Sequence, residues 1–246
     1  MRRLLLPALF AAAAFCVLSG LGVWQLQRLA WKEALIAAIA DRSQAAPAAV
    51  PPPAEWAALD PQDYDYRRVT VTGTFLHSSE QLVFRILEGG KSSLSAAGFL
   101  ALTPLRLPGG QTIIINRGFV PQEVRDPAKR QAGQMSGAVT ITGLMRPPEP
   151  RNFFTPADDP AKGLWYTRDP GAMAKALELA RAAPFTIDAD ASPNPGGWPL
   201  GGLTALAIKN DHLSYALTWF GLALTLLAVF AVFVWRSLRQ LQRNAP

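Results

Sequence analysis

The sequence predicts a membrane protein of mixed α and β structure, with two transmembrane helices flanking a mostly antiparallel β domain that contains about one helix. Apolar runs without Asp, Glu, Lys or Arg lie near both chain ends. Each is long enough, at about 1.5 Å per residue, to cross a bilayer core of about 30 Å. Between them the apolar residues alternate, which is typical of half-buried strands.

These patterns divide the chain into seven segments. We expect a cytoplasmic N-terminus (1–3), a first transmembrane helix (4–24), a helical extension (25–43), a Pro/Ala-rich spacer (44–63), an extracytoplasmic β-rich domain (64–211), a second transmembrane helix (212–235) and a basic cytoplasmic tail (236–246).

The first apolar run, Leu4 to Trp24, has two interpretations. Its basic start and apolar middle also fit a secretory signal peptide. However, the run is long for that purpose, and the nearest small-x-small site is the distant Ala38-Ile39-Ala40. Phe15 also occupies the position where a lipoprotein cleavage site needs a small residue before Cys16. We therefore expect an uncleaved helix.

The helical pattern continues beyond this run, and four of its residues form a stripe along one face of the helix. Trp24, Arg28, Trp31 and Leu35 recur at i, i+4, i+7 and i+11. The stripe is either an interfacial aromatic belt with a cation that reaches toward water, or a contact face for a partner membrane protein. Spacing alone favours the belt.

The central domain has the pattern of short strands separated by turns, which Gly89-Gly90 and Pro108-Gly109-Gly110 mark. A helix is expected to start near Asp169-Pro170-Gly171 and to run through 172–182. Expected strands are 68–75, 81–87, 97–104, 111–120, 138–144, 185–189 and 203–208. Together they predict a compact, mostly antiparallel sheet or partial barrel.

Charge placement predicts the orientation in the membrane. All acidic residues lie between the two apolar runs, whereas their outer ends carry Arg2, Arg3, Arg236, Arg239 and Arg243. Both termini should therefore be cytoplasmic, although Arg28 and Lys32 near the far end of the first run oppose this assignment. Most of the net charge of +6 comes from these five flanking arginines, so the domain between the two apolar runs is nearly neutral. The sequence therefore predicts no nucleic-acid-binding surface.

Catalytic and metal-binding motifs are scarce. The chain has two histidines, His77 and His212, and one cysteine inside the first apolar run. This inventory excludes a zinc or copper site of ordinary ligand spacing and covalent haem attachment. A Ser/His dyad at His77 lacks a nucleophile-elbow pattern. We expect no enzyme.

Two polar groups remain as candidates. His212, Tyr215 and Trp219 share a helical face at the head of the second apolar run. In addition, Asn116-Arg117-Gly118 follows the apolar strand residues 113–115. Arg117 either pairs with a carboxylate of its own domain or anchors a ligand carboxylate or propionate; the residues alone favour the first.

Four segments resemble signatures of the Surfeit locus protein 1 family, in the family's order. They are Gly22 to Lys32, Tyr66 to Phe75, Asn116 to Pro121 and Asn210 to Trp219. The resemblance implies an assembly factor for haem–copper (aa3-type) cytochrome c oxidase that helps to deliver haem a to its catalytic subunit. It also implies residence in a bacterial or mitochondrial inner membrane. The high alanine and arginine content favours the bacterial inner membrane, with a periplasmic main domain.

By resemblance, His212 is the expected ligand of the haem iron, although the residues alone also allow an interfacial cap pairing with Asp211. The other expected haem-contacting residues are Tyr215, Trp219, Trp24, Gln25, Arg28 and Arg117. Expected partners are subunit I of the oxidase, haem a synthase and membrane lipid. Two alternatives stay open: a scaffold that stabilises a nascent oxidase subunit without binding haem, and a two-span sensor of a ligand.

Overall fold

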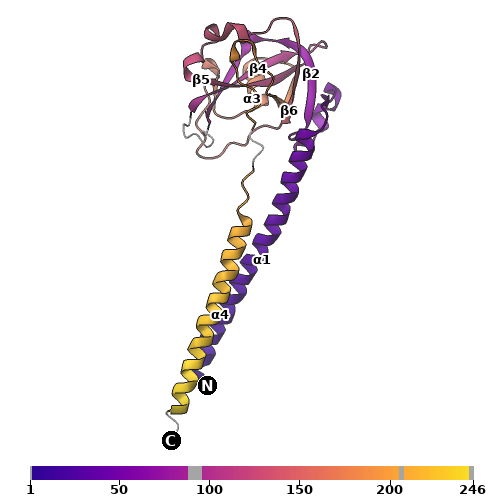
Figure 1. The fold of residues 1–246 in the computed structure, drawn as a ribbon. Coiled ribbons are helices and arrows are strands. Elements are labelled where there is room, and N and C mark those ends of the chain that lie inside the picture. Colours follow the sequence, from indigo (N-terminus) through magenta and orange to yellow (C-terminus); the bar gives the residue numbers. More distant parts are fainter. Residues whose placement is uncertain (1, 88–95, 205–207, 244–246) are drawn as a thin grey trace. The chain divides into compact units, whose positions relative to one another are not determined.

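A computed structural model of the chain describes residues 2–87, 96–204 and 208–243 (Figure 1). The chain divides into two compact units, which we describe separately. The helical unit comprises Met1–Ala38 and Ala207–Pro246, and the outer unit comprises Ile39–Leu206.

The helical unit contains most of α1 (Arg2–Gln44) and all of α4 (His212–Arg243). By length and composition both helices can cross a membrane, over Leu4–Gln44 and His212–Gln240. Their most apolar stretches are 0% and 6% buried, respectively, so the leucine, valine and phenylalanine side chains face outward. In a soluble protein such helices would be covered, and lipid is the environment that suits them.

The outer unit is built on one sheet of eight described strands, in the order β1-β2-β6-β8-β5-β4-β3-β7. The strands are β1 (Ala48–Ala49), β2 (Arg68–Phe75), β3 (Gln81–Leu87), β4 (Ala96–Arg106), β5 (Thr112–Pro121), β6 (Ala138–Arg146), β7 (Leu164–Trp165) and β8 (Ala182–Ala189). Its α-helices are α2 (Pro61–Tyr64) and α3 (Pro170–Ala176). Short 3-10 helices cover Pro53–Ala58, His77–Ser79, Gln122–Val124, Pro127–Gly133, Pro160–Lys162 and Pro195–Gly197.

An additional pairing closes this sheet into a small barrel. Thr74 and Phe75 at the end of β2 pair with Arg106 and Leu105 of β4. The ring then runs β2-β6-β8-β5-β4 and returns to β2. Neighbouring strands in this ring are antiparallel, except that β5 and β8 are parallel. The structure thus confirms the predicted class, two long apolar helices around a mostly antiparallel β domain.

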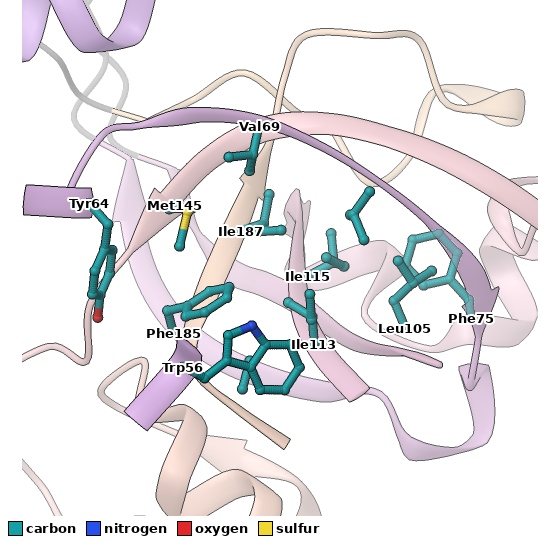
Figure 2. Packing of buried hydrophobic residues seen from close by; sticks show 12 residues of the cluster. Trp56, Tyr64, Val69, Phe75, Leu105, Ile113, Ile115, Met145, Phe185 and Ile187 are labelled. Atoms are coloured by element: carbon teal, nitrogen blue, oxygen red, sulfur yellow. The ribbon is translucent and has the colours of Figure 1, made fainter. Parts of the chain in front are cut away.

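The barrel interior holds the main hydrophobic core (Figure 2). Val69, Val71 and Phe75 alternate inward along β2, as the period-two pattern predicts. β5 differs because it is buried from Thr112 to Val120, which follows from its central place between β4 and β8.

The segment predicted as a spacer contributes to this core. Trp56 is buried and packs edge-on against Phe185 (Figure 2), with ring centroids 5.7 Å apart. Its indole N–H donates to the carbonyl of Pro51 at 2.8 Å. The segment is not an extended spacer throughout, because it contains the 3-10 helix Pro53–Ala58 and α2, each of which begins with a proline. Trp56 in the 3-10 helix attaches the segment to the barrel.

Two other predictions differ from the structure in extent. α3 ends at Ala176 and not near residue 182, and Glu178 shortly beyond it has a positive φ of 55°. Leu203 and Thr204, expected to begin a last strand, are irregular, and positions 205–207 lie outside the described residues. The turn expected at Gly89-Gly90 also lies outside them.

Candidate functional site

The head of α4 places an imidazole at its first residue. His212 begins the helix, and its backbone N–H lies 3.4 Å from Oδ1 of Asn210. The carboxylate of Asp211 pairs with Lys209 at 2.7 Å. His212 therefore does not pair with Asp211, which was the alternative that the residues alone allowed.

The partner of His212 is Gln25 of α1. Nδ1 of His212 lies 2.7 Å from Oε1 of Gln25, and Gln25 is buried. An amide oxygen only accepts hydrogen bonds, so Nδ1 carries the proton in this pair. In the neutral ring Nε2 then keeps its lone pair, which is the form of imidazole that coordinates a metal. A hydrogen bond at the other ring nitrogen is also how proteins orient histidine ligands.

Small residues surround this pair on both helices. A Cβ added at Gly22 of α1 would stand 2.6 Å from the ring of Phe220 on α4. On α4, Ala216 and Ala223 are buried at i+4 and i+11 from His212. Small side chains let helix backbones approach closely in membranes, so this face suits a helix contact that includes His212.

The other predicted residues of the helical unit lie around the pair. Tyr215 and Trp24 are about half exposed on the helix surfaces, and Trp219 is partly buried. The guanidinium of Arg28 lies 4.4 Å from the ring centroid of Trp31, one turn further along the predicted stripe. Of the predicted set, the structure joins only His212 and Gln25 by a direct hydrogen bond.

Arg117 belongs to the outer unit and has partners there. Its Nη2 donates to the carbonyl of Gly133 and, at 3.4 Å, to Oδ1 of Asn194. Nη1 lies 4.0 Å from Glu80, and the guanidinium covers the ring of Phe75 at 4.8 Å. Burial lowers the pKa of Arg117 to about 10, against the opposing effect of Glu80. A ligand-anchoring role for Arg117 stays a prediction.

The neighbouring Asn116 lines a different cavity from Arg117. Because successive side chains of a strand point to opposite faces, Asn116 and Arg117 separate across β5. Asn116 and Gly118 line a cavity of about 340 Å³, whereas Arg117 lines another of about 120 Å³. The amide and the guanidinium, which are adjacent in sequence, do not form one site.

The larger cavity contains charged residues that sequence reasoning did not select. They are Arg85, Arg146, Glu149, Arg168 and Asp188, and they come from β3, β6, β8 and the connections between β6 and α3. No local motif marks them, because each is a single charge in a different segment. A charged residue between apolar neighbours, as in Phe84-Arg85-Ile86, is the only signal the sequence carries.

Comparison with known proteins gives a consistent family assignment. The model of the SURF1 family matches residues 11–224, which include Gln25 and His212. The chain is 41% identical over 219 residues to the SURF1-like protein of Monosiga brevicollis, covering 86% of this chain and 81% of that protein. It is 38% identical over 229 residues to Surfeit locus protein 1 of Rattus norvegicus, covering 89% and 72%. Identity to the Homo sapiens protein of that name is 39% over 215 residues, covering 83% and 69%.

Proposed function

This chain belongs to the SURF1 family, and from that membership we propose that it is an assembly factor for haem–copper (aa3-type) cytochrome c oxidase that helps to deliver haem a to the catalytic subunit. A general role in assembly of cytochrome c oxidase follows from the family. Haem a delivery, the finer part of the proposal, is argued below from the residues of the helical unit.

The observation that carries the haem step is the His212–Gln25 hydrogen bond of 2.7 Å. The donor chemistry fits haem, which supplies an iron centre that accepts an imidazole nitrogen. His212 would hold that iron through Nε2. Gln25 would keep the proton on Nδ1 and orient the ring, which makes it a positioning residue.

The surroundings of the pair suit a large apolar ring system with acidic substituents. Trp24, Tyr215 and Trp219 offer aromatic faces, and Arg28 offers a cation for a propionate. A single protein ligand also favours release, because breaking one coordinate bond frees the haem. Arg117, the remaining predicted contact, lies in the outer unit, where its partners are Gly133, Asn194 and Glu80.

Location and partners complete the proposal. We place both termini in the cytoplasm and the outer unit in the periplasm, with α1 and α4 in the bacterial inner membrane. The partners would be subunit I of the oxidase, which receives the haem, and haem a synthase, which produces it. The chain itself would hold and transfer haem without catalysing a reaction.

The first test asks whether His212 holds haem. The full chain would be produced in cells that make haem a, purified in detergent, and its visible absorbance per protein measured. We expect His212→Ala to lower haem occupancy by at least about tenfold and Gln25→Leu by roughly tenfold. Added imidazole should restore bound haem to His212→Ala, because it replaces the missing ligand. The control His77→Ala removes the other histidine and should keep full occupancy.

Unchanged occupancy in His212→Ala would show that the ligand assignment is wrong. A chain that never carries haem but co-purifies with an oxidase subunit would instead identify a scaffold. The general role is tested separately, by reduced-minus-oxidised spectra of membranes with and without the gene. An unchanged haem a signal, after exclusion of a second gene copy, would contradict the assembly role itself.

A further inference from the structure

The cavity of about 340 Å³ in the outer unit has no part in the proposed haem step. We name it the arginine cavity, after Arg85, Arg146 and Arg168 in its lining. Its volume lies within the range of small-molecule sites, about 300–1,000 Å³. Leu87, Leu100 and Leu203 add apolar walls to these charged groups.

The carboxylate of Asp188 in this cavity is fully engaged. Both of its oxygens accept from Nη1 of Arg168, at 2.8 and 3.0 Å. Asn116 Nδ2 donates to Oδ1 and Thr204 Oγ1 donates to Oδ2, each at 2.9 Å. A buried carboxylate with four such contacts has little capacity to receive a donor from a ligand.

Glu149 is engaged in the same way. It pairs with Arg85, accepts from the backbone N–H of Arg168 at 2.9 Å, and lies 3.6 Å from Nη2 of Arg168. Burial alone would raise the pKa of Glu149, but Arg168 and Arg85 outweigh it and hold the pKa below its usual value. The two carboxylates of the cavity are therefore both occupied.

The donors, in contrast, are in surplus. Within the described part of the chain, no nitrogen of the Arg146 guanidinium donates a hydrogen bond, and neither does Nε of Arg168. Arg146 stacks on Tyr66 at 3.8 Å, and its Nε stands 2.9 Å from Asp65 without the alignment of a hydrogen bond. Nε of Arg168 and Nε of Arg146 are enclosed by the protein, so the nitrogens that a group in the cavity can reach are Nη1 and Nη2 of Arg146. These two donors have no protein acceptor among the described residues, and a negatively charged acceptor in the cavity would form charge-assisted hydrogen bonds with them.

We propose that the arginine cavity binds a small organic monocarboxylate. Its carboxylate would accept hydrogen bonds from Nη1 and Nη2 of Arg146, because the guanidinium fork matches that geometry. Its apolar part would lie against Leu87, Leu100 and Leu203. A dianion such as phosphate fits less well, because Glu149 and Asp188 already place two negative charges in the cavity. The acid could be a free molecule or the carboxyl end of a peptide.

The test uses the full chain in lipid nanodiscs and saturation-transfer NMR with benzoate as the probe. Benzamide is the matched neutral probe, since it has the same shape and no charge. We expect saturable binding of benzoate and at least about tenfold weaker binding of benzamide. Acetyl-leucyl-leucine provides the peptide arm: stronger binding than benzoate would assign the natural ligand to a chain terminus, and weaker binding would assign it to a free acid.

Variants locate the binding. Arg146→Gln should weaken benzoate binding at least about tenfold, and Leu203→Trp should reduce it by filling the cavity while keeping every charge. Arg106→Gln removes an exposed arginine at the end of β4 and should bind benzoate normally. His212→Ala should also bind normally, which separates this inference from the haem proposal. The inference would be overturned if the unmodified chain showed no saturable binding of benzoate. It would also be overturned if Arg146→Gln and Leu203→Trp both bound benzoate as tightly as the unmodified chain.

Discussion

At the scale of single residues, Glu80 is the counter-charge of two buried arginines. Arg130 donates to its two carboxylate oxygens, through Nη1 at 3.1 Å and through Nη2. Arg117 lies at 4.0 Å from it, and all three side chains are almost fully buried. Such a cluster is stable only while its members compensate one another, because a lone buried charge is strongly unfavourable.

We therefore expect Glu80→Gln to destabilise the chain by about 3–5 kcal/mol, because it leaves two buried guanidiniums without a counter-charge. The measurement is chemical unfolding in detergent, followed by the change in tryptophan fluorescence, to which the buried Trp56 and Trp165 of the outer unit contribute. Glu123→Gln is the control, since it makes the same chemical change at an exposed position. Equal stability of the two variants would mean that Glu80 is not needed as the counter-charge of Arg117 and Arg130.

At the scale of elements, β5 separates two polar environments. Asn116 contributes to the arginine cavity, and Arg117 to the buried cluster around Glu80 on the other face. Gly118 follows with a φ of 120°, and there the backbone of Phe119 exchanges two hydrogen bonds of 2.9 Å with Leu200. This pairing brings the segment that holds Leu203 and Thr204 to the rim of the cavity.

Gly118 is required for that close approach. A Cβ at this position would stand 2.0 Å from the carbonyl oxygen of Leu200, in addition to the strain of a positive φ. We expect Gly118→Ala to destabilise the outer unit by more than about 2 kcal/mol. Gly137 has a φ of 78° and open space around it, so Gly137→Ala should cost only about 1 kcal/mol. Thermal unfolding of both variants checks the difference, and equal costs would exclude the Leu200 contact as the cause.

At the scale of the whole molecule, the two units bury their apolar residues in opposite ways. The outer unit encloses its core inside a closed barrel, whereas the helical unit carries its leucines and phenylalanines on the outside. Each arrangement suits one solvent, water for the barrel and lipid for the helices.

The proposed orientation predicts which cysteines a membrane-impermeant maleimide can reach. Cys16 is first replaced by serine, because it is the only native thiol. In that background Ser136→Cys, in an exposed loop of the outer unit, should label in spheroplasts. Asn244→Cys in the basic tail should label only after the membrane is opened. The reverse pattern would show that the termini face outward.

The sequence by itself determined the features that depend on local pattern. Charge-free runs of sufficient length predicted both long apolar helices. Residues typical of strands predicted β2 and β3 to the residue, with strict alternation in β2. These predictions succeed because a helix or a half-buried strand repeats its apolar positions within a few residues. His212 was a candidate from its position at the head of the second apolar run, and the family signatures added Gln25 from the other end of the chain.

Only the tertiary structure decided which distant residues meet. Closure of the barrel by β2 and β4, the burial of Trp56, and the pairing of His212 with Gln25 each join separate segments. The arginine cavity is the clearest case, because its charges lie on several segments and none carries a motif. Contacts of this kind depend on how the whole chain closes around its core, and a local sequence pattern holds no record of that closure.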